Sequence, residues 1–241
     1  VKPKVAFIEG HGELDDMETY DITLALQDNY IVDRVTINGK ISSLVSRTLV
    51  DSVNLEYSII PSYAAIIVAK PDSVLSPKDK FIIDQYIMYG GKVLWLIDPV
   101  FASMDSIQSQ ENTVSIENNT DLQTQLFTYG AKINRDLILD LSAMLIPIRT
   151  GQVGGQAQID FFPWYYFPLI TSTSQHPITK NLNAIKTQFV SSLDTTSVKG
   201  VKKTILLRTS DYSKVEQVPN LISLQLLREE PDMIQYSGPS R

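Results

Sequence analysis

The stretch Ala64–Pro99, AAIIVAKPDSVLSPKDKFIIDQYIMYGGKVLWLIDP, decides the fold class of this chain. It opens with a short apolar run, which predicts a strand buried on both faces. Ser76 suits the N-cap of a helix and Pro77 its first residue. Gly90-Gly91 then supplies a left-handed stop, and Val93–Ile97 predicts a second buried strand. A strand, a capped helix and a returning strand form a right-handed parallel unit.

The same pattern occurs once before this stretch. Val5–Ile8 and Tyr30–Ile37 are apolar runs that predict strands. Glu13–Asn29, between them, predicts a helix. The apolar face expected of this helix consists of Met17, Tyr20 and Leu24. Residues 4–98 are therefore expected to form a parallel sheet with helices on its faces.

For the whole chain we expect an α/β fold. It would be a three-layer, mostly parallel sheet of the glutamine-amidotransferase-like or flavodoxin-like kind, with an elaborated C-terminal half. Residues 1–100 would form a Rossmann-like core, and residues 101–241 a C-terminal extension of short strands and loops packed on the same core. The candidate strands of the extension are Leu137–Leu139, Leu145–Ile148, Ile159–Phe162, Phe189–Leu193 and Thr204–Leu207.

Composition excludes several classes of function. The 241 residues carry a net charge of −6 with scattered Lys and Arg, so no nucleic-acid partner is expected. The absence of cysteine excludes a cysteine nucleophile, a thiolate metal site and disulfides. The sequence holds two histidines and lacks the phosphate-binding pattern GxxxxGK(S/T), so we expect neither a metal nor a cofactor.

Polar side chains follow the ends of the predicted parallel strands, where such sheets bind ligands. They are Glu9, His11, Glu13, Lys70 and Asp98. A carboxylate beside an imidazole can tune a general base, so these residues could line a small-ligand pocket or support acid–base chemistry. The alternative is purely structural: His11 bonds the loop backbone, Asp98 caps a turn, and Lys70 pairs with one of the acids.

Two better-defined kinds of site are disfavoured by the same loops. GHGELD, residues 10–15, lacks the third glycine of a dinucleotide-binding loop, and its acids would repel a pyrophosphate. VAKPDS, residues 68–73, contains no cysteine, and Pro71 beside Ser73 does not suit a nucleophile elbow. GHGE therefore reads as a turn from a strand into a helix.

An aromatic run in the second half is the candidate partner surface. Its four consecutive aromatic residues cannot all face inward in a regular helix or strand. Exposed aromatics often mark contact surfaces, whereas an arm folded back on the sheet edge would bury them. Both interpretations are open for Trp164, Tyr165, Tyr166 and Phe167.

Five stretches together resemble a known family: VAFIEGHGE, IIVAKPDSVLSPKDKFIIDQYIMYGGKVLWLIDPV, LFTYGAKINRDLILDL, PWYYFPLI and HPITKNL. In this order they resemble the GldG family, gliding-motility-associated auxiliary components of bacterial ABC transporters. The family's domain is called the ABC-type uncharacterised transport system domain. It is similar to the GIFT domain of intraflagellar-transport proteins. The resemblance covers nearly the whole chain, and IDQYIMYGGKVLWLIDPV is its most specific part.

The resemblance implies a membrane-anchored protein whose part seen here lies at the periplasmic face of the inner membrane. The implied partners are an ABC ATPase subunit and a membrane permease subunit, with the gliding or secretion machinery as further candidates. A homo-oligomer is left open. No catalytic residue is implied. The chain starts at Val1-Lys2-Pro3 and ends at Ser240-Arg241 without a closing element, so we expect an excised part of a longer protein.

We therefore expect a non-enzymatic module of a gliding-motility ABC transporter that acts through protein–protein contacts. One alternative is a solute- or glycan-binding module with a pocket near His11 and Asp98 and with Trp164 as a stacking platform. The other is a remnant hydrolase of amidotransferase-like fold.

Overall fold

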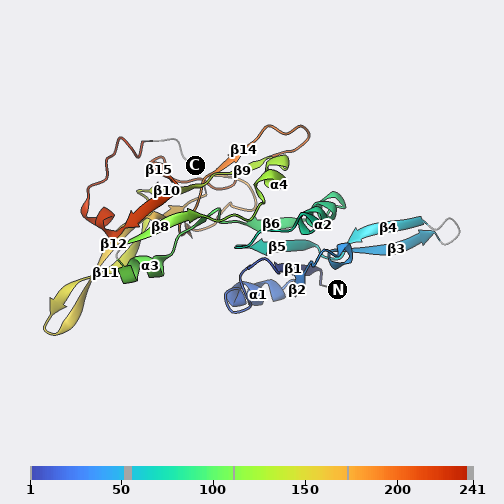
Figure 1. Cartoon of the computed structure of the whole chain (residues 1–241), viewed down its shortest axis with the longest axis horizontal. Helices are drawn as coiled ribbons and strands as arrows, with labels where there is room; N and C mark the ends of the chain where they lie inside the picture. Colours follow the sequence, from blue (N-terminus) through green and yellow to red (C-terminus); the bar gives the residue numbers. More distant parts are fainter. Residues whose placement is uncertain (1, 52–55, 111, 173, 238–241) are drawn as a thin grey trace. The chain divides into compact units, whose positions relative to one another are not determined.

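The structure, a computed structural model, describes residues 2–51, 56–110, 112–172 and 174–237 (Figure 1). The chain divides into two compact units. Unit 1 comprises Val1–Asp98 together with Asn119–Gln125, and unit 2 comprises Pro99–Asn118 and Leu126–Arg241. The boundary after residue 98 lies beside the one expected from sequence, but a short segment beyond it returns to unit 1. How the extension packs on the core stays a prediction.

Unit 1 is built on a four-stranded parallel sheet with strand order β2-β1-β5-β6. Its strands are β1 (Lys4–Glu9), β2 (Ile31–Thr36), β5 (Ala65–Ala69) and β6 (Val93–Leu96). These are the strands that the apolar runs predict. The parallel unit over Ala64–Pro99 is thereby confirmed.

Helix α2 (Pro77–Met88) joins β5 to β6 and starts as its sequence predicts. The Ser76 side chain accepts a hydrogen bond from the Asp79 N–H at 3.1 Å, and Pro77 occupies the first turn. The helix buries Ile82, Ile83 and Tyr86. The Tyr86 hydroxyl donates to the carbonyl oxygen of Tyr63 at 2.9 Å, which ties the helix to the residues that enter β5.

Helix α1 (Tyr20–Gln27) is shorter than predicted and differently oriented. Residues 13–19 form a loop, and none of the helix residues is fully buried. Leu26 packs against the cluster of Phe7, Ile67 and Ala69 on one face of the sheet. Met17, Tyr20 and Leu24, predicted as the apolar face, are 83%, 57% and 47% exposed, so that prediction is wrong.

Between β2 and β5 the chain leaves the parallel sheet. A short 3-10 helix, η1 (Ile41–Ser43), precedes an antiparallel hairpin of β3 (Val45–Asp51) and β4 (Glu56–Pro61). Figure 1 shows this hairpin projecting from the parallel sheet of the same unit.

Unit 2 consists of antiparallel pairings. Its sheets have the orders β10-β15, β11-β12-β13, β14-β9 and β16-β8-β7. The strands are β7 (Val100–Phe101), β8 (Asn112–Glu117), β9 (Ala131–Ile133), β10 (Asp136–Asp140), β11 (Ala143–Val153), β12 (Gln156–Ile170), β13 (Ile185–Lys186), β14 (Leu193–Thr195), β15 (Ser213–Gln217) and β16 (Asn220–Ser223). The remaining helices are α3 (Met104–Gln110), α4 (Gln123–Thr128), which spans the unit boundary, and the 3-10 helix η2 (Leu224–Arg228).

The prediction of a mostly parallel sheet is therefore wrong for the chain as a whole. Only the four-stranded sheet of unit 1 is parallel among the described sheets, and the fold is a mixed α/β arrangement of several sheets with few helices. Candidate strands near β10, β11 and β12 are confirmed. Thr204–Leu207 forms no strand, and of Phe189–Leu193 only Leu193 belongs to one, β14. Antiparallel pairing prevails because hairpins and long-range strand returns, rather than crossover helices, connect the strands here.

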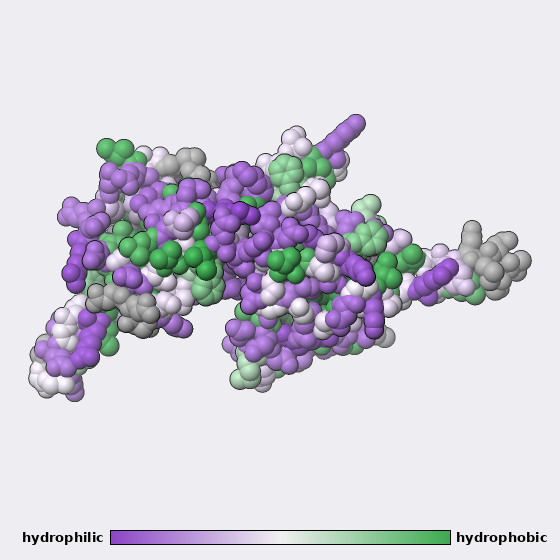
Figure 2. Space-filling model, in the orientation of Figure 1, coloured by the Kyte–Doolittle hydropathy of each residue, from purple (hydrophilic) through white to green (hydrophobic). Residues whose placement is uncertain are grey.

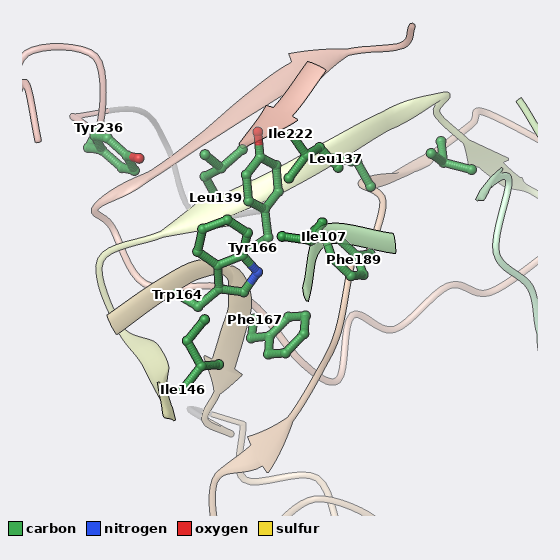
Figure 3. Packing of buried hydrophobic residues seen from close by; sticks show 11 residues of the cluster. Ile107, Leu137, Leu139, Ile146, Trp164, Tyr166, Phe167, Phe189, Ile222 and Tyr236 are labelled. Atoms are coloured by element: carbon green, nitrogen blue, oxygen red, sulfur yellow. The ribbon is translucent and has the colours of Figure 1, made fainter. Parts of the chain in front are cut away.

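Unit 2 has its own hydrophobic core, centred on Trp164 (Figure 3). The Trp164 ring lies 5.4 Å from that of Tyr166, and Phe167 meets Phe189 edge to face at 5.1 Å. Figure 3 shows Leu137, Leu139, Ile146 and Ile222 around these rings. Among the described residues, no helix is long and apolar enough to cross a membrane.

Candidate functional site

The imidazole of His11 lies between two carboxylates at the carboxyl edge of the parallel sheet. Its Nδ1 is 3.1 Å from Oε1 of Glu13, and its Nε2 is 3.3 Å from Oδ2 of Asp79. The His11 backbone N–H also donates to Oε2 of Glu13 at 2.7 Å. The side chains of His11 and Glu13 are only 8% and 1% exposed, so the contact is shielded from water.

Asp79 receives hydrogen bonds from three different segments. Its Oδ1 accepts from the backbone N–H of Gly39 at 2.8 Å, and its Oδ2 accepts from the Ser76 hydroxyl at 2.8 Å. With His11 as the third segment, this carboxylate joins the loop after β1, the loop after β2 and the first turn of α2. The sequence interpretation missed Asp79, although Ser76 and Asp79 have the spacing of a helix-capping pair.

The two carboxylates set the charge state of His11. The hydrogen bond to Glu13 raises the His11 pKa above its ordinary value, against the lowering effect of burial, and Asp79 raises it further. For Asp79, burial alone would raise the pKa. The hydrogen bonds from Gly39, Ser76 and His11 outweigh burial, so the Asp79 pKa is lowered. The contacts among His11, Glu13 and Asp79 therefore favour a protonated imidazole and an ionised Asp79.

The backbone of the GHGE turn is held by close packing. Both Asp72 and Ser73 donate their N–H groups to the carbonyl oxygen of His11 at 3.0 Å. Gly12 has φ +74°, and a Cβ there would lie 1.6 Å from Oδ1 of Asp72. The backbone angle favours glycine at this position, and an added Cβ would force the carboxylate of the exposed Asp72 to move.

Glu9 belongs to a different contact, centred on Arg34 of β2. The two side chains form an ion pair across β1 and β2, and Arg34 Nη2 donates to the carbonyl oxygen of Leu14 at 2.6 Å. Nη1 donates to the hydroxyl of Thr19 at 2.9 Å and pairs with Asp16 at 3.1 Å. Arg34 therefore fixes the loop that leads into α1, a role that the sequence interpretation missed.

Lys70 and Asp98 form a third contact. Lys70 Nζ lies 2.9 Å from Asp98 Oδ2, with side chains 53% and 34% exposed. Such an exposed ion pair contributes at most about 1 kcal/mol to stability. The five predicted ligand-binding residues thus fall into three separate described contacts: His11 with Glu13, Glu9 with Arg34, and Lys70 with Asp98. Ligand binding at this edge stays a prediction.

This geometry supports structural roles better than acid–base chemistry. Both ring nitrogens of His11 face carboxylates, whereas the neighbouring serine hydroxyls donate to aspartates: Ser73 to Asp72 at 2.7 Å, and Ser76 to Asp79. A serine nucleophile needs its own contact with the imidazole. In the part of the chain that the structure describes, no group of three or more His, Asp or Glu side chains is arranged to hold a metal ion.

The aromatic segment lies in the core of unit 2. Trp164, Tyr166 and Phe167 are 0%, 3% and 3% exposed, and Tyr165 is half-buried with its ring 5.8 Å from that of Tyr236. Of the two open interpretations, this burial matches the folded-back arm rather than an exposed contact surface, and it excludes Trp164 as a stacking platform. The physical reason is a strand irregularity: Met144 pairs with Trp164, but Ala143 pairs with Pro168. The intervening residues bulge, so they need not alternate between faces.

The exposed apolar residues of the same strand lie a few positions earlier. Ile159 and Phe161 are 55% and 64% exposed, and Leu145 on β11 is 52% exposed. In the β11–β12 register Arg149 pairs with Ile159, Pro147 with Phe161, and Leu145 with Pro163. Directly paired residues project from the same face of a hairpin. We call Leu145, Ile159 and Phe161 the hairpin stripe; period-2 alternation through FFPW could have predicted it.

Comparisons with known proteins give a family and a fold. A family model described as "ABC-type uncharacterized transport system" matches residues 2–241. A solved structure described as "mmIFT52 N-terminal domain" is similar with a TM-score of 0.53 and 13% sequence identity, covering 87% of this chain and 74% of that chain. At this identity the likeness concerns the fold alone. A search of curated proteins found no significant match.

Proposed function

Because this chain belongs to the ABC-type uncharacterized transport system family, we propose that it is a non-catalytic, periplasmic part of a membrane-anchored gliding-motility transporter component of the GldG type. Family membership over residues 2–241 makes it an auxiliary component of an ABC-type transport system. In the proposal it acts through contacts with the ATPase and permease subunits, or with the gliding or secretion machinery.

One observation carries the non-catalytic part of the proposal. His11, the best candidate base, has both ring nitrogens against carboxylates from its own chain, and its side chain is 8% exposed. A general base must reach the proton it removes, directly or through one water. Here both ring nitrogens already contact carboxylates, so the imidazole holds loops of its own chain together. This arrangement also speaks against the remnant hydrolase.

The hairpin stripe is the surface that best supports a contact role. Leu145, Ile159 and Phe161 are each more than half exposed on one face of the β11–β12 hairpin. Figure 2 shows hydrophobic residues as separate patches on a largely hydrophilic face. Aromatic and aliphatic side chains that are clustered and exposed are typical anchors of protein interfaces. We propose that a subunit of the same transport system covers them.

The test is capture of co-expressed ATPase and permease subunits by the full chain. A double variant, Leu145→Ser with Phe161→Ser, should capture at least about tenfold less partner, since burying such side chains contributes about 1.5–3 kcal/mol each. The matched control is Ile178→Ser, which removes an apolar side chain that is 65% exposed elsewhere in unit 2.

The melting temperature separates docking from folding in this experiment. All variants alter exposed residues and should melt like the wild type. Equal capture by the double variant and by wild type would refute the hairpin stripe as the contact. Turnover of any glycan, ester or amide substrate by the purified chain, lost in His11→Gln, would refute the non-catalytic assignment.

A further inference from the structure

Unit 1 contains an apolar groove beside the start of α2, with a volume of about 450 Å³. We call it the α2 groove; it is lined by Gly39, Ile41, Pro77, Lys78, Phe81 and Ile82. Ile82 is buried, whereas Phe81 and Ile41 are 57% and 43% exposed. Two large apolar side chains therefore stand at the solvent-facing part of a concave surface, and an apolar groove of this kind can mark an interaction site.

The groove is held in shape by the contacts around Asp79. The Gly39 N–H on one wall donates to Asp79 Oδ1 at 2.8 Å, and Asp79 belongs to the helix that forms the other wall. The stem of Lys78 also crosses Gly39: its Cδ lies 3.5 Å from where a Gly39 Cβ would stand. Because both walls are fixed, a ligand would not have to order them, and this favours binding.

Two basic residues occur at and beside the groove. Lys78 lines it, and Lys40 lies between the lining residues Gly39 and Ile41. Among the described residues, neither ammonium group has an ion-pair partner, whereas nearby Lys80 pairs with Asp121. The carboxylate of Asp79, 10% exposed, faces the protonated ring of His11 at 3.3 Å rather than either lysine. In a chain with net charge −6, the two lysines are a local site for a negative group.

We propose that the α2 groove docks a short acidic segment of a partner protein, with an apolar side chain in the groove and a flanking carboxylate against Lys78 and Lys40. A pocket for a free small molecule usually encloses most of its ligand. The α2 groove leaves Phe81 more than half exposed, so it suits one or two side chains of a larger partner. The inference is independent of the hairpin stripe, which lies in unit 2.

The probe is a fluorescein-labelled peptide with Leu-Phe between pairs of glutamates, titrated with the full chain and followed by anisotropy. Two comparison peptides replace the glutamates with lysines, or Leu-Phe with Ser-Ser. We expect the acidic apolar peptide to bind at least about tenfold more tightly than either, with affinity falling as salt rises. Equal affinity for the glutamate and lysine peptides would overturn the proposal.

Variants locate the binding. Phe81→Ser should weaken the acidic peptide by about tenfold or more. Lys78→Glu should weaken it as well and should improve binding of the lysine peptide. The matched control is Met88→Ser, because Met88 is 72% exposed on the same helix but does not line the groove. Unchanged binding in Phe81→Ser, or equal losses in Phe81→Ser and Met88→Ser, would also overturn the proposal.

Phe161→Ser serves as the control for the hairpin stripe. It should leave peptide binding unchanged, so failure of the proposed function and failure of the α2 groove give different results. Melting curves of each variant show whether the fold is retained, which is expected because Phe81 and Lys78 are not core residues.

Discussion

His11 and Asp79 are 68 residues apart in sequence, and the 3.3 Å contact between Nε2 and Oδ2 joins the turn after the first strand to the first turn of α2. A neutral imidazole carries one N–H, whereas a protonated one carries two. Only the protonated ring can donate to both Glu13 and Asp79. The contact is therefore complete only while His11 is charged.

Stability should depend on pH through His11. Because the folded pKa of His11 is raised above its ordinary value of 6.5, its stabilisation is fully present below about pH 6.5 and is lost as pH rises through the folded pKa. The melting temperature of the wild type should fall in a step as the pH rises across this range. His11→Gln should lack that step. His176→Gln, which removes the other histidine, should keep the step; a step that persists in His11→Gln would contradict the assignment.

Asp79→Ala should be among the most destabilising substitutions of a charged residue in unit 1. It removes the acceptor for Gly39 and Ser76 and leaves His11 facing a single carboxylate. Unpaired buried groups cost about 1–3 kcal/mol each, so we expect a loss of about 3 kcal/mol in urea unfolding. Asp28→Ala, at an exposed helix end, should change stability by no more than about 0.5 kcal/mol. Similar losses for the two variants would contradict the role of Asp79.

Gly12→Ala should lower the free energy of unfolding more than Gly154→Ala, because Gly154 has a left-handed backbone but no close neighbour. Gly12 and Gly154 have φ of +74° and +60°, but only Gly12 faces a neighbour, Asp72, within 4 Å of an added Cβ. Left-handed backbone costs a non-glycine residue about 1–2 kcal/mol, which is the loss expected for Gly154→Ala. Gly12→Ala should lose more, since Asp72 must also move. Equal unfolding free energies would show that the close approach does not matter.

Trp164→Ala and Phe161→Ala should separate the core from the surface of one strand. Trp164 is fully buried, and removing a buried tryptophan costs about 3–5 kcal/mol. Phe161 is 64% exposed, so its removal should cost less than about 0.5 kcal/mol. Chemical denaturation of both variants gives the comparison. A small loss for Trp164→Ala would place the aromatic segment outside the core.

Much of unit 1 follows from local sequence. The Ser76-Pro77 start of α2 and the strands on either side depend on neighbouring residues only, and these predictions are confirmed. Helix α1 shows where local pattern fails. The period of Met17, Tyr20 and Leu24 predicts an inward face, but the sheet is contacted through Leu14 and Leu26 instead.

Apart from the β11–β12 hairpin, most pairings of the antiparallel half could not be predicted because they join segments that are distant in sequence. Ser115 and Asn220, for example, exchange hydrogen bonds across 105 residues between β8 and β16. Similarly, His11 and Glu13 are candidates from the sequence, while Asp79 and Gly39 join them only through the tertiary fold. The aromatic segment required knowledge of the bulge opposite Ala143 and Met144, which no periodicity reveals.

The return of Asn119–Gln125 to unit 1 has a practical meaning for dissecting this protein. Leu122 is 1% exposed, and the carbonyl oxygen of Thr120 accepts from Leu75 N–H at 3.1 Å. A fragment ended at Asp98 would lose both, although its parallel sheet would be intact. Deletion mapping with single cut points would thus report damage to folding as loss of binding, and point substitutions are the sounder instrument for assigning roles to either half.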